Sequence, residues 1–295
     1  MANYVLTTCS TVDLEWEHLE KRNIDYFSFS YYLDSQEYKD DLGKSLSYDD
    51  FYKKMTDGVE TKTAQPSLED LKTFFRPYLE QGLDVFNLML SSGLSGTYNT
   101  AQIVVKELSE EFPDRKIYIV DSLGASSGMG LFLDKIADLR DNGYTIDELR
   151  AWTEENRLKV HHWFFSTDLT FFVKGGRVSR VAGWFGTILK ICPLLNVDNM
   201  GRLVPREKIR GKANVIKQIV KKMEENAENG LNYSGKCYIS HSACYEDALA
   251  VKKLIEEKFK SLDGEVEIHS IGTTIGSHTG PGTVALFFFG KERIN

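Results

Sequence analysis

Short apolar runs alternate with amphipathic stretches along the first half of the chain. Residues 84–90 (DVFNLML) form one such run, which is typical of a buried strand. Two of the amphipathic stretches begin with a capping-box pattern, Ser67 to Asp70 and Thr145 to Glu148. This alternation predicts an α/β protein whose mainly parallel sheet carries helices on both faces. The expected strands are residues 4–7, 84–90, 116–120 and 160–165, and helices are expected over 97–110 and 126–140 and after Ser67 and Thr145.

The helix expected after Ser67 contains a proline. Leu71, Phe75 and Tyr78 lie at helical spacing, and Pro77 stands among them. Because proline lacks an N–H and crowds the preceding turn, we expect Pro77 to end or kink this helix.

The pattern changes after about residue 166. The turn at residues 198–201 separates two short apolar runs and predicts a β-hairpin. A long Lys/Glu-rich helix is expected over 212–229, ending at Gly230. Further strands are expected at 236–240, 265–271 and 283–289, with a helix at 245–261, which together predict a second sheet. We therefore divide the chain into an N-terminal α/β domain, residues 1–165, and a C-terminal α/β domain, residues 166–295.

The charge of the chain is uneven. Thirty-six Lys and Arg against 43 Asp and Glu give a net charge of −7, which argues against a general nucleic-acid binder. Between Lys174 and Lys212, however, nine basic residues face only two acidic ones. This basic segment indicates either a local anionic ligand or acidic partner, or simply a solvated face.

Cysteine spacing and the terminal segments exclude other classes. None of the four cysteines forms a CxxC, and no pair of Cys/His couplets has zinc spacing, so no metal site is expected. The longest apolar run, residues 284–289, is far too short to span a bilayer, and the N-terminus lacks the regions of a signal peptide. These features predict a cytoplasmic protein with reduced thiols.

A serine- and glycine-rich loop joins a predicted strand to a helix. Residues 90–97 (LSSGLSGT) lie where parallel α/β sheets place ligands, and their N–H groups with the hydroxyls of Ser92, Ser95 and Thr97 could meet an anionic oxygen. The alternative is a glycine-allowed turn with hydroxyl caps. A serine-hydrolase elbow would need glycine at position 97, so a Ser95/His278 acyl hydrolase is only weakly indicated.

Two further segments carry candidate chemistry. His278 lies within residues 276–282 (GSHTGPG), which we interpret as a Gly/Pro-bounded loop where an imidazole can bind a carboxylate or move a proton. The alternative is a histidine bonded only to its own loop. Residues 174–177 (KGGR) can end a helix and free backbone amides for an anion, with Arg177 as a bidentate contact. Here the alternative is a plain helix end beside a solvated basic face.

Seven short motifs follow one another along the chain. They are residues 9–14 (CSTVDL), 63–67 (TAQPS), 92–98 (SGLSGTY), 121–128 (DSLGASSG), 174–177 (KGGR), 210–211 (RG) and 278–282 (HTGPG). In this order they resemble the DegV family of bacterial fatty-acid-binding proteins, and the resemblance runs from residue 5 to about residue 289.

The resemblance implies a two-domain protein that holds one long-chain fatty acid, with no covalently bound cofactor. The family's carboxylate-binding residues fall on Thr63, Ser95 and His278. Members that act as FakB subunits present the acid to the catalytic subunit of fatty acid kinase, which uses ATP and Mg²⁺ to make acyl-phosphate. Transient contact with a membrane surface is implied for lipid exchange. Supporting loop positions are Ser92, Gly96, Thr97, Thr279 and Gly280, and Arg177 and Arg210 match a phosphoryl-transfer or kinase-docking surface.

Two positions depart from the family pattern. Cys9 stands where an aspartate is usual, and Ala64 replaces a serine, so the hydrogen bonds near the head group are expected to differ. The residues agree with the implied function on physical grounds, because an acyl chain needs an apolar slot and its carboxylate needs fixed donors. A lipid carrier or sensor without a kinase partner remains the main alternative.

Overall fold

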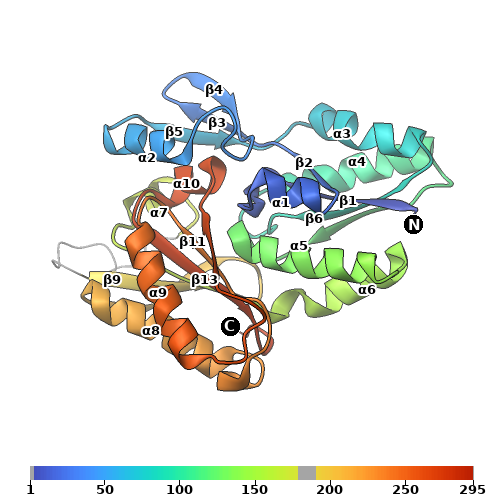
Figure 1. The fold of residues 1–295 in the computed structure, drawn as a ribbon. Coiled ribbons are helices and arrows are strands. Elements are labelled where there is room, and N and C mark those ends of the chain that lie inside the picture. Colours follow the sequence, from blue (N-terminus) through green and yellow to red (C-terminus); the bar gives the residue numbers. More distant parts are fainter. Residues whose placement is uncertain (1–2, 179–190, 295) are drawn as a thin grey trace.

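The first half of the chain forms a four-stranded parallel sheet. The computed structural model describes residues 3–178 and 191–294. The strand order is β2-β1-β6-β7, and every neighbouring pair is parallel. This confirms the predicted parallel sheet (Figure 1). The strands are β1 (Tyr4–Cys9), β2 (Ile24–Phe27), β6 (Asp84–Met89) and β7 (Ile117–Asp121).

Helices cover both faces of this sheet, as predicted. α3 (Leu68–Glu80) and α4 (Thr97–Glu111) pack together on one face, while α5 (Ser126–Asp141) and α6 (Ile146–Asn156) lie on the other (Figure 1). The short helix α1 (Trp16–Lys21) leads into β2. Both predicted capping boxes are present, at Ser67 and Thr145.

Pro77 does not end α3. The helix continues for three residues beyond it, to Glu80, so the expectation that Pro77 ends the helix is wrong, while the alternative, a kink at Pro77, stays a prediction. Pro77 and Thr73, whose carbonyl the missing N–H would have bonded, are both exposed, so water can satisfy that carbonyl.

The second half forms a mixed six-stranded sheet with the order β10-β9-β8-β13-β11-β12. Only the β11–β12 pair is parallel. The hairpin predicted at 198–201 joins β9 to β10. The strands are β8 (Val160–Ser166), β9 (Ile191–Val197), β10 (Leu203–Arg210), β11 (Tyr238–His241), β12 (Glu267–Ser270) and β13 (Thr283–Phe289).

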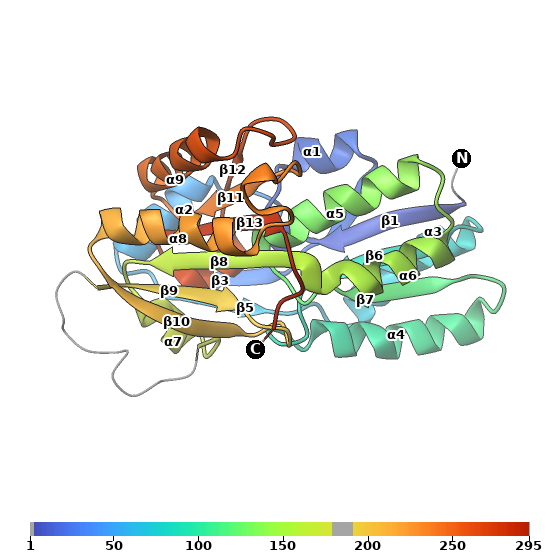
Figure 2. The ribbon, with the colours of Figure 1, turned by 90° about the horizontal axis from the view of Figure 1, so that it is seen from below.

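Two helices cover one face of the mixed sheet. α8 (Lys212–Asn226) packs on β8, β9 and β10, and α9 (Tyr245–Lys258) packs on β11 and β12 (Figure 2). α8 ends three residues earlier than expected, and Gly230 instead begins the short 3₁₀ helix η3 (Gly230–Asn232). Because β8 already belongs to this sheet, the sheet starts before residue 165, and the domain division at that residue stays a prediction.

A third, small sheet was not predicted. β3 (Ser30–Leu33), β4 (Gln36–Lys39) and β5 (Thr61–Ala64) form an antiparallel sheet in the order β4-β3-β5. The helix α2 (Tyr48–Thr56) packs against it through Phe51, Tyr52 and Met55. Two other short helices complete the fold, α7 (Thr170–Lys174) and α10 (Thr273–Thr279).

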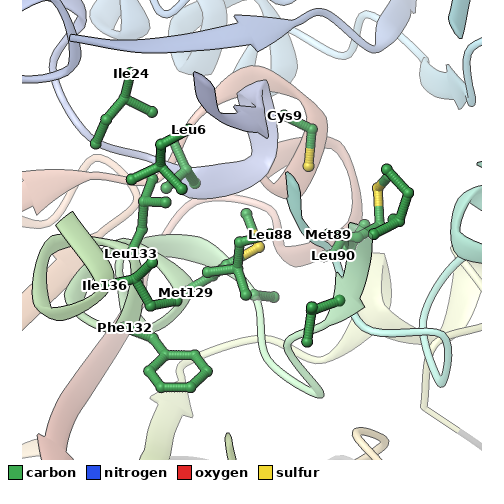
Figure 3. Packing of buried hydrophobic residues seen from close by; sticks show 14 of the residues in the cluster. Leu6, Cys9, Ile24, Leu88, Met89, Leu90, Met129, Phe132, Leu133 and Ile136 are labelled. Carbon is green, nitrogen blue, oxygen red and sulfur yellow. The ribbon is translucent and has the colours of Figure 1, made fainter. Parts of the chain in front are cut away.

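Helix α5 is shared by the two large sheets. Its apolar residues pack with the strands of the parallel sheet, as Met129, Phe132, Leu133 and Ile136 show beside Leu6 and Leu88 (Figure 3). The same helix contacts β8, β11 and β13 of the mixed sheet. No helix in the described parts of the chain is long and apolar enough to cross a membrane.

A buried carboxylate on α5 ties distant parts of the chain together. Asp134 is about 1% exposed and accepts hydrogen bonds from Arg22 of the segment after α1 and from Lys236, just before β11. His18 and the Tyr238 hydroxyl also lie at hydrogen-bond distance from this carboxylate. These cations and hydrogen bonds outweigh burial and hold the Asp134 pKa far below its usual value.

Replacing this carboxylate should destabilise the protein strongly. We expect Asp134→Ala to lower the free energy of unfolding by about 3 kcal/mol, because it leaves Arg22 and Lys236 without their buried partner. The matched control is Asp141→Ala, whose carboxylate also binds Arg22 but is 52% exposed, and which should cost less than about 1 kcal/mol. Urea unfolding measures both values, and equal losses would contradict the assignment.

Candidate functional site

A cavity of about 520 Å³ lies where the three sheets approach one another. Its walls come from β5, the loop after β6, the start of α5, the strands β8 and β13, and the helices α7 and α10. This volume is in the usual range of small-molecule sites. Most of its lining is apolar: Phe29, Leu90, Leu94, Ala125, Phe164, Phe172, Val197, Leu203, Ile271, Ile275, Ala285 and Phe287.

Thr63 and His278 form the polar pair at this cavity. The Oγ1 atom of Thr63 lies 2.8 Å from Nε2 of His278. Arg177 Nη1 lies 3.5 Å from Nδ1 of the same ring, and because a guanidinium only donates, Nδ1 is the accepting nitrogen. Nε2 then carries the proton and donates to Thr63, which leaves the Thr63 hydroxyl hydrogen free to donate to a ligand.

The segment that carries His278 is helical, so its interpretation as a loop is wrong. His278 lies in the last turn of α10, and only Gly280 to Gly282 form the connection to β13. Hydrogen bonds from residues distant in sequence fix the start of this helix: Asp40 accepts from Thr274 N, and the Tyr52 hydroxyl donates to Ile271 O. The glycines that suggested a loop instead allow close packing, as at Gly276, where a Cβ would lie 2.5 Å from the Tyr52 hydroxyl.

Burial keeps the His278 imidazole neutral. Desolvation lowers its pKa from 6.5 to about 4, and the positive charge of Arg177 acts in the same direction. A neutral imidazole donates one hydrogen bond and accepts another, which matches the contacts to Thr63 and Arg177.

The KGGR segment ends α7 and brings Arg177 to the cavity. A Cβ on Gly175 would lie 2.4 Å from His278 Nδ1, so glycine is required where this backbone meets the ring. The amides of Gly175 and Gly176 donate to helix carbonyls, so the expectation that these glycines free their amides for an anion is wrong. Burial lowers the pKa of the Arg177 guanidinium, which nevertheless remains a cation at neutral pH.

Ser95 reaches the same cavity from the serine- and glycine-rich loop. Its hydroxyl lies 2.8 Å from Oγ1 of Thr97 and accepts a hydrogen bond from Thr97 N. Ser91 anchors the loop through its carbonyl, which accepts from the amides of Leu94 and Ser95, and through its hydroxyl, which donates to Gly201 O of the β9–β10 hairpin. The amides of Leu94, Ser95 and Thr97 are thus used within the loop, and the Ser95 hydroxyl can donate to a ligand.

The other predicted loop positions divide into two groups. Gly96 and Thr279 line the cavity. Ser92 is exposed, and its amide donates to Asp121, while Thr97 is buried behind Ser95. Gly280 stands beside the ring of Phe171, where a Cβ would come within 2.2 Å, and its φ of 67° also favours glycine.

The two predicted arginines occupy different places. Arg177 lines the cavity, whereas Arg210 is exposed at the last position of β10 and does not belong to the described lining. Of the basic segment, residues 179–190 lie outside the described residues. The Arg177 and Arg210 surface therefore stays a prediction.

Of the two positions that depart from the family pattern, Ala64 lines the cavity and Cys9 lies outside the described lining. Cys9 is buried, its Sγ lies 3.2 Å from the Thr11 hydroxyl, and burial raises the pKa of its thiol to about 11. It is therefore a neutral packing residue, not a nucleophile. Ala64 follows Thr63 on β5 and lines the cavity as an apolar surface.

The surroundings of Ser95 and His278 differ from those of a serine-hydrolase triad. Among the described residues, no hydrogen bond joins Ser95 to His278, because Ser95 bonds Thr97 and His278 bonds Thr63. The other ring nitrogen of His278 faces a cation, Arg177, where a triad would place a carboxylate.

Sequence reasoning missed His162 as a cavity residue. The two adjacent histidines of β8 point to opposite faces, as strand geometry requires: His162 lines the cavity, and His161 stacks on Phe288 and contacts Lys291 O. One sequence signal was available: side chains alternate between the two faces of a strand, so Thr283, Ala285 and Phe287 of β13 lie on one face, which is the face that lines the cavity.

Comparison with known proteins agrees with the motif resemblance. A family model described as "Uncharacterised protein, DegV family" matches residues 4–291. A DegV domain-containing protein of Clostridium perfringens is 36% identical over 99% of both chains. A fatty acid-binding protein of Thermotoga maritima is 34% identical, over 96% of this chain and 95% of its own length.

Solved structures share the fold over nearly the whole chain. A DegV lipid-binding protein from Thermotoga maritima has a TM-score of 0.82 at 30% identity, covering 99% of this chain and 100% of its own. The Streptococcus pneumoniae Fatty Acid Kinase (Fak) B3 protein loaded with linoleic acid has a TM-score of 0.83 at 20% identity, with the same coverage. At that identity the second likeness shows the fold alone.

The low pKa of His278 is directly measurable. In the ligand-free protein we expect the ring to titrate near pH 4 by NMR, with the resonance assigned by its loss in His278→Gln. Arg177→Ala should raise the midpoint only partly toward 6.5, because burial is the larger cause. A midpoint near 6.5 in the unsubstituted protein would contradict the buried, neutral imidazole.

Proposed function

Because the chain belongs to the DegV family, we propose that it binds a long-chain fatty acid and presents the carboxylate to a separate kinase subunit. The observation that carries the proposal is an apolar cavity of about 520 Å³ with the Thr63–His278 pair in its wall. The name of the Thermotoga maritima relative, a fatty acid-binding protein 34% identical to this chain, supports the ligand class.

A fatty acid has an apolar chain and a polar carboxylate, and the cavity has an apolar wall and polar side chains to match them. Each methylene transferred from water to an apolar wall contributes about 0.8 kcal/mol. The carboxylate needs donors, since burying an unpaired charge is strongly unfavourable. The hydroxyls of Thr63 and Ser95 are donors of this kind, and both residues line the cavity.

A second hollow supports presentation to a partner. It has a volume of about 500 Å³ and shares Thr63, Arg177 and His278 with the acyl cavity. Lys62, Lys174 and Glu60 also line it, and Lys174 pairs with Glu60 at 2.9 Å, so the carboxylate would meet a space in which cations outnumber the one carboxylate. The partner would bring ATP and Mg²⁺, and this chain would contribute position and charge. Loading of the acid from a membrane surface belongs to the same proposal.

Substitution of Ser95 or His278 should weaken fatty-acid binding. We expect the protein purified from bacteria to carry one fatty acid per chain in native mass spectrometry, and Ser95→Ala or His278→Ala to lower fatty-acid affinity about 10- to 100-fold. The matched control is His241→Ala, because this half-buried histidine at the end of β11 lies outside the described lining. A protein that carries no lipid and refuses added palmitate and oleate would overturn the proposal.

The kinase step is tested separately with a fatty acid kinase catalytic subunit, ATP and Mg²⁺. We expect Arg210→Glu to lower acyl-phosphate formation at least tenfold while lipid content is unchanged, because Arg210 is exposed and outside the described cavity lining. The control is Lys221→Glu on α8, 60% exposed. Full activity of the Arg177→Glu/Arg210→Glu double variant would refute the docking surface, and no product from the unsubstituted protein would favour a carrier or sensor.

A further inference from the structure

Two neighbouring strands run along the length of the acyl cavity. Thr283, Ala285 and Phe287 of β13 face it in succession, starting from the end of β13 that follows His278. With a strand rise of about 3.4 Å per residue, Thr283 to Phe287 spans roughly 14 Å. Phe287 therefore lies roughly 14 Å along the cavity wall from Thr283, the first residue of β13 after the helix that carries His278.

The far end is formed by an aromatic pair across the two strands. His162 of β8 is the register partner of Phe287, and their rings meet edge to face with centroids 5.3 Å apart. The next residues on the same strand faces, Val160 and Phe289, do not line the cavity. Phe289 instead packs against Phe132 of α5 and borders a separate hollow of about 350 Å³, whose lining does not include His162 or Phe287.

The His162 ring is held so that it cannot swing aside. A Cβ on Gly124 would lie 2.6 Å from the His162 ring, and a Cβ on Gly128 would lie 2.4 Å from the Phe287 ring and 2.5 Å from the His162 ring. The backbone around the start of α5 therefore packs directly against this pair. Nδ1 of His162 also lies 3.1 Å from Val160 O, which fixes the orientation of the ring. At 3% exposure the ring has no solvent to move into.

We propose that His162 and Phe287 form a rigid end wall that sets the upper length of the acyl chain. The preferred ligand is then a monocarboxylate whose terminal methyl reaches this wall. A longer chain would have to displace a ring wedged against glycine backbone, and a shorter one would leave apolar surface uncovered. This inference rests on the proposed fatty-acid binding and specifies its substrate range.

The neighbouring residues of each strand give matched controls. His162→Ala and Phe287→Leu remove part of the wall. His161→Ala and Phe288→Leu are the controls, because they change the same residue types on the opposite face of the sheet, where His161 and Phe288 stack on one another. All four positions are buried, so each pair carries a comparable risk to folding. Thermal unfolding identifies variants that fold.

The measurement is the affinity for a series of saturated fatty acids, together with mass spectrometry of the co-purified lipid. For His162→Ala or Phe287→Leu we expect the optimum to move to longer chains, with a gain of about fourfold per added methylene. His161→Ala and Phe288→Leu should keep the original optimum. An unchanged optimum in folded wall variants would overturn the end wall, whereas an unsubstituted protein that binds no fatty acid would overturn the proposed function itself.

Discussion

The packing of one helix between two sheets is the constraint on which the rest of the structure depends. α5 buries Met129, Phe132 and Ile136 against the parallel sheet, and its first turn approaches the mixed sheet so closely that Gly128 has no room for a side chain. Because α5 also carries Asp134, the charges of the two halves of the chain meet on it. Once α5 is seated, the loop after β6, the strands β8 and β13 and the small third sheet enclose a cavity whose walls come from distant segments.

The polar end of that cavity depends on the same assembly. His278 and Thr63 are 215 residues apart in sequence, and they meet because α10 packs beside β5. The ring is neutral because it is buried, and it can be buried because Gly175 lets the end of α7 lie against it. Asp40 and Tyr52 fix the other end of α10, so the imidazole is placed by contacts along the whole short helix.

Local sequence signals predicted those parts of the structure whose causes are local. The capping boxes at Ser67 and Thr145 and the apolar run 84–90 need only their own neighbours, and the parallel sheet follows from their order. The β3–β4–β5 sheet was missed because its four-residue strands carry little periodicity. His278 was placed in a loop because the residue that caps α10, Asp40, is far away in sequence. The resemblance placed Thr63, Ser95 and His278, which line one cavity, but only three-dimensional register shows His162 opposite Phe287.

Affinity and reactivity are separated along this cavity. An acyl chain gains about 0.8 kcal/mol per buried methylene, so a long chain outweighs the roughly 1.5–3 kcal/mol of a hydrogen bond to its carboxylate. The apolar walls therefore retain the ligand, and the polar pair mainly orients it. Thr63, Arg177 and His278 belong to both hollows, so the position proposed for the carboxylate lies where the two hollows meet. A site built in this way can hold its ligand firmly while leaving the reactive end to chemistry supplied from outside, since the groups that orient the carboxylate are not the groups that retain the chain.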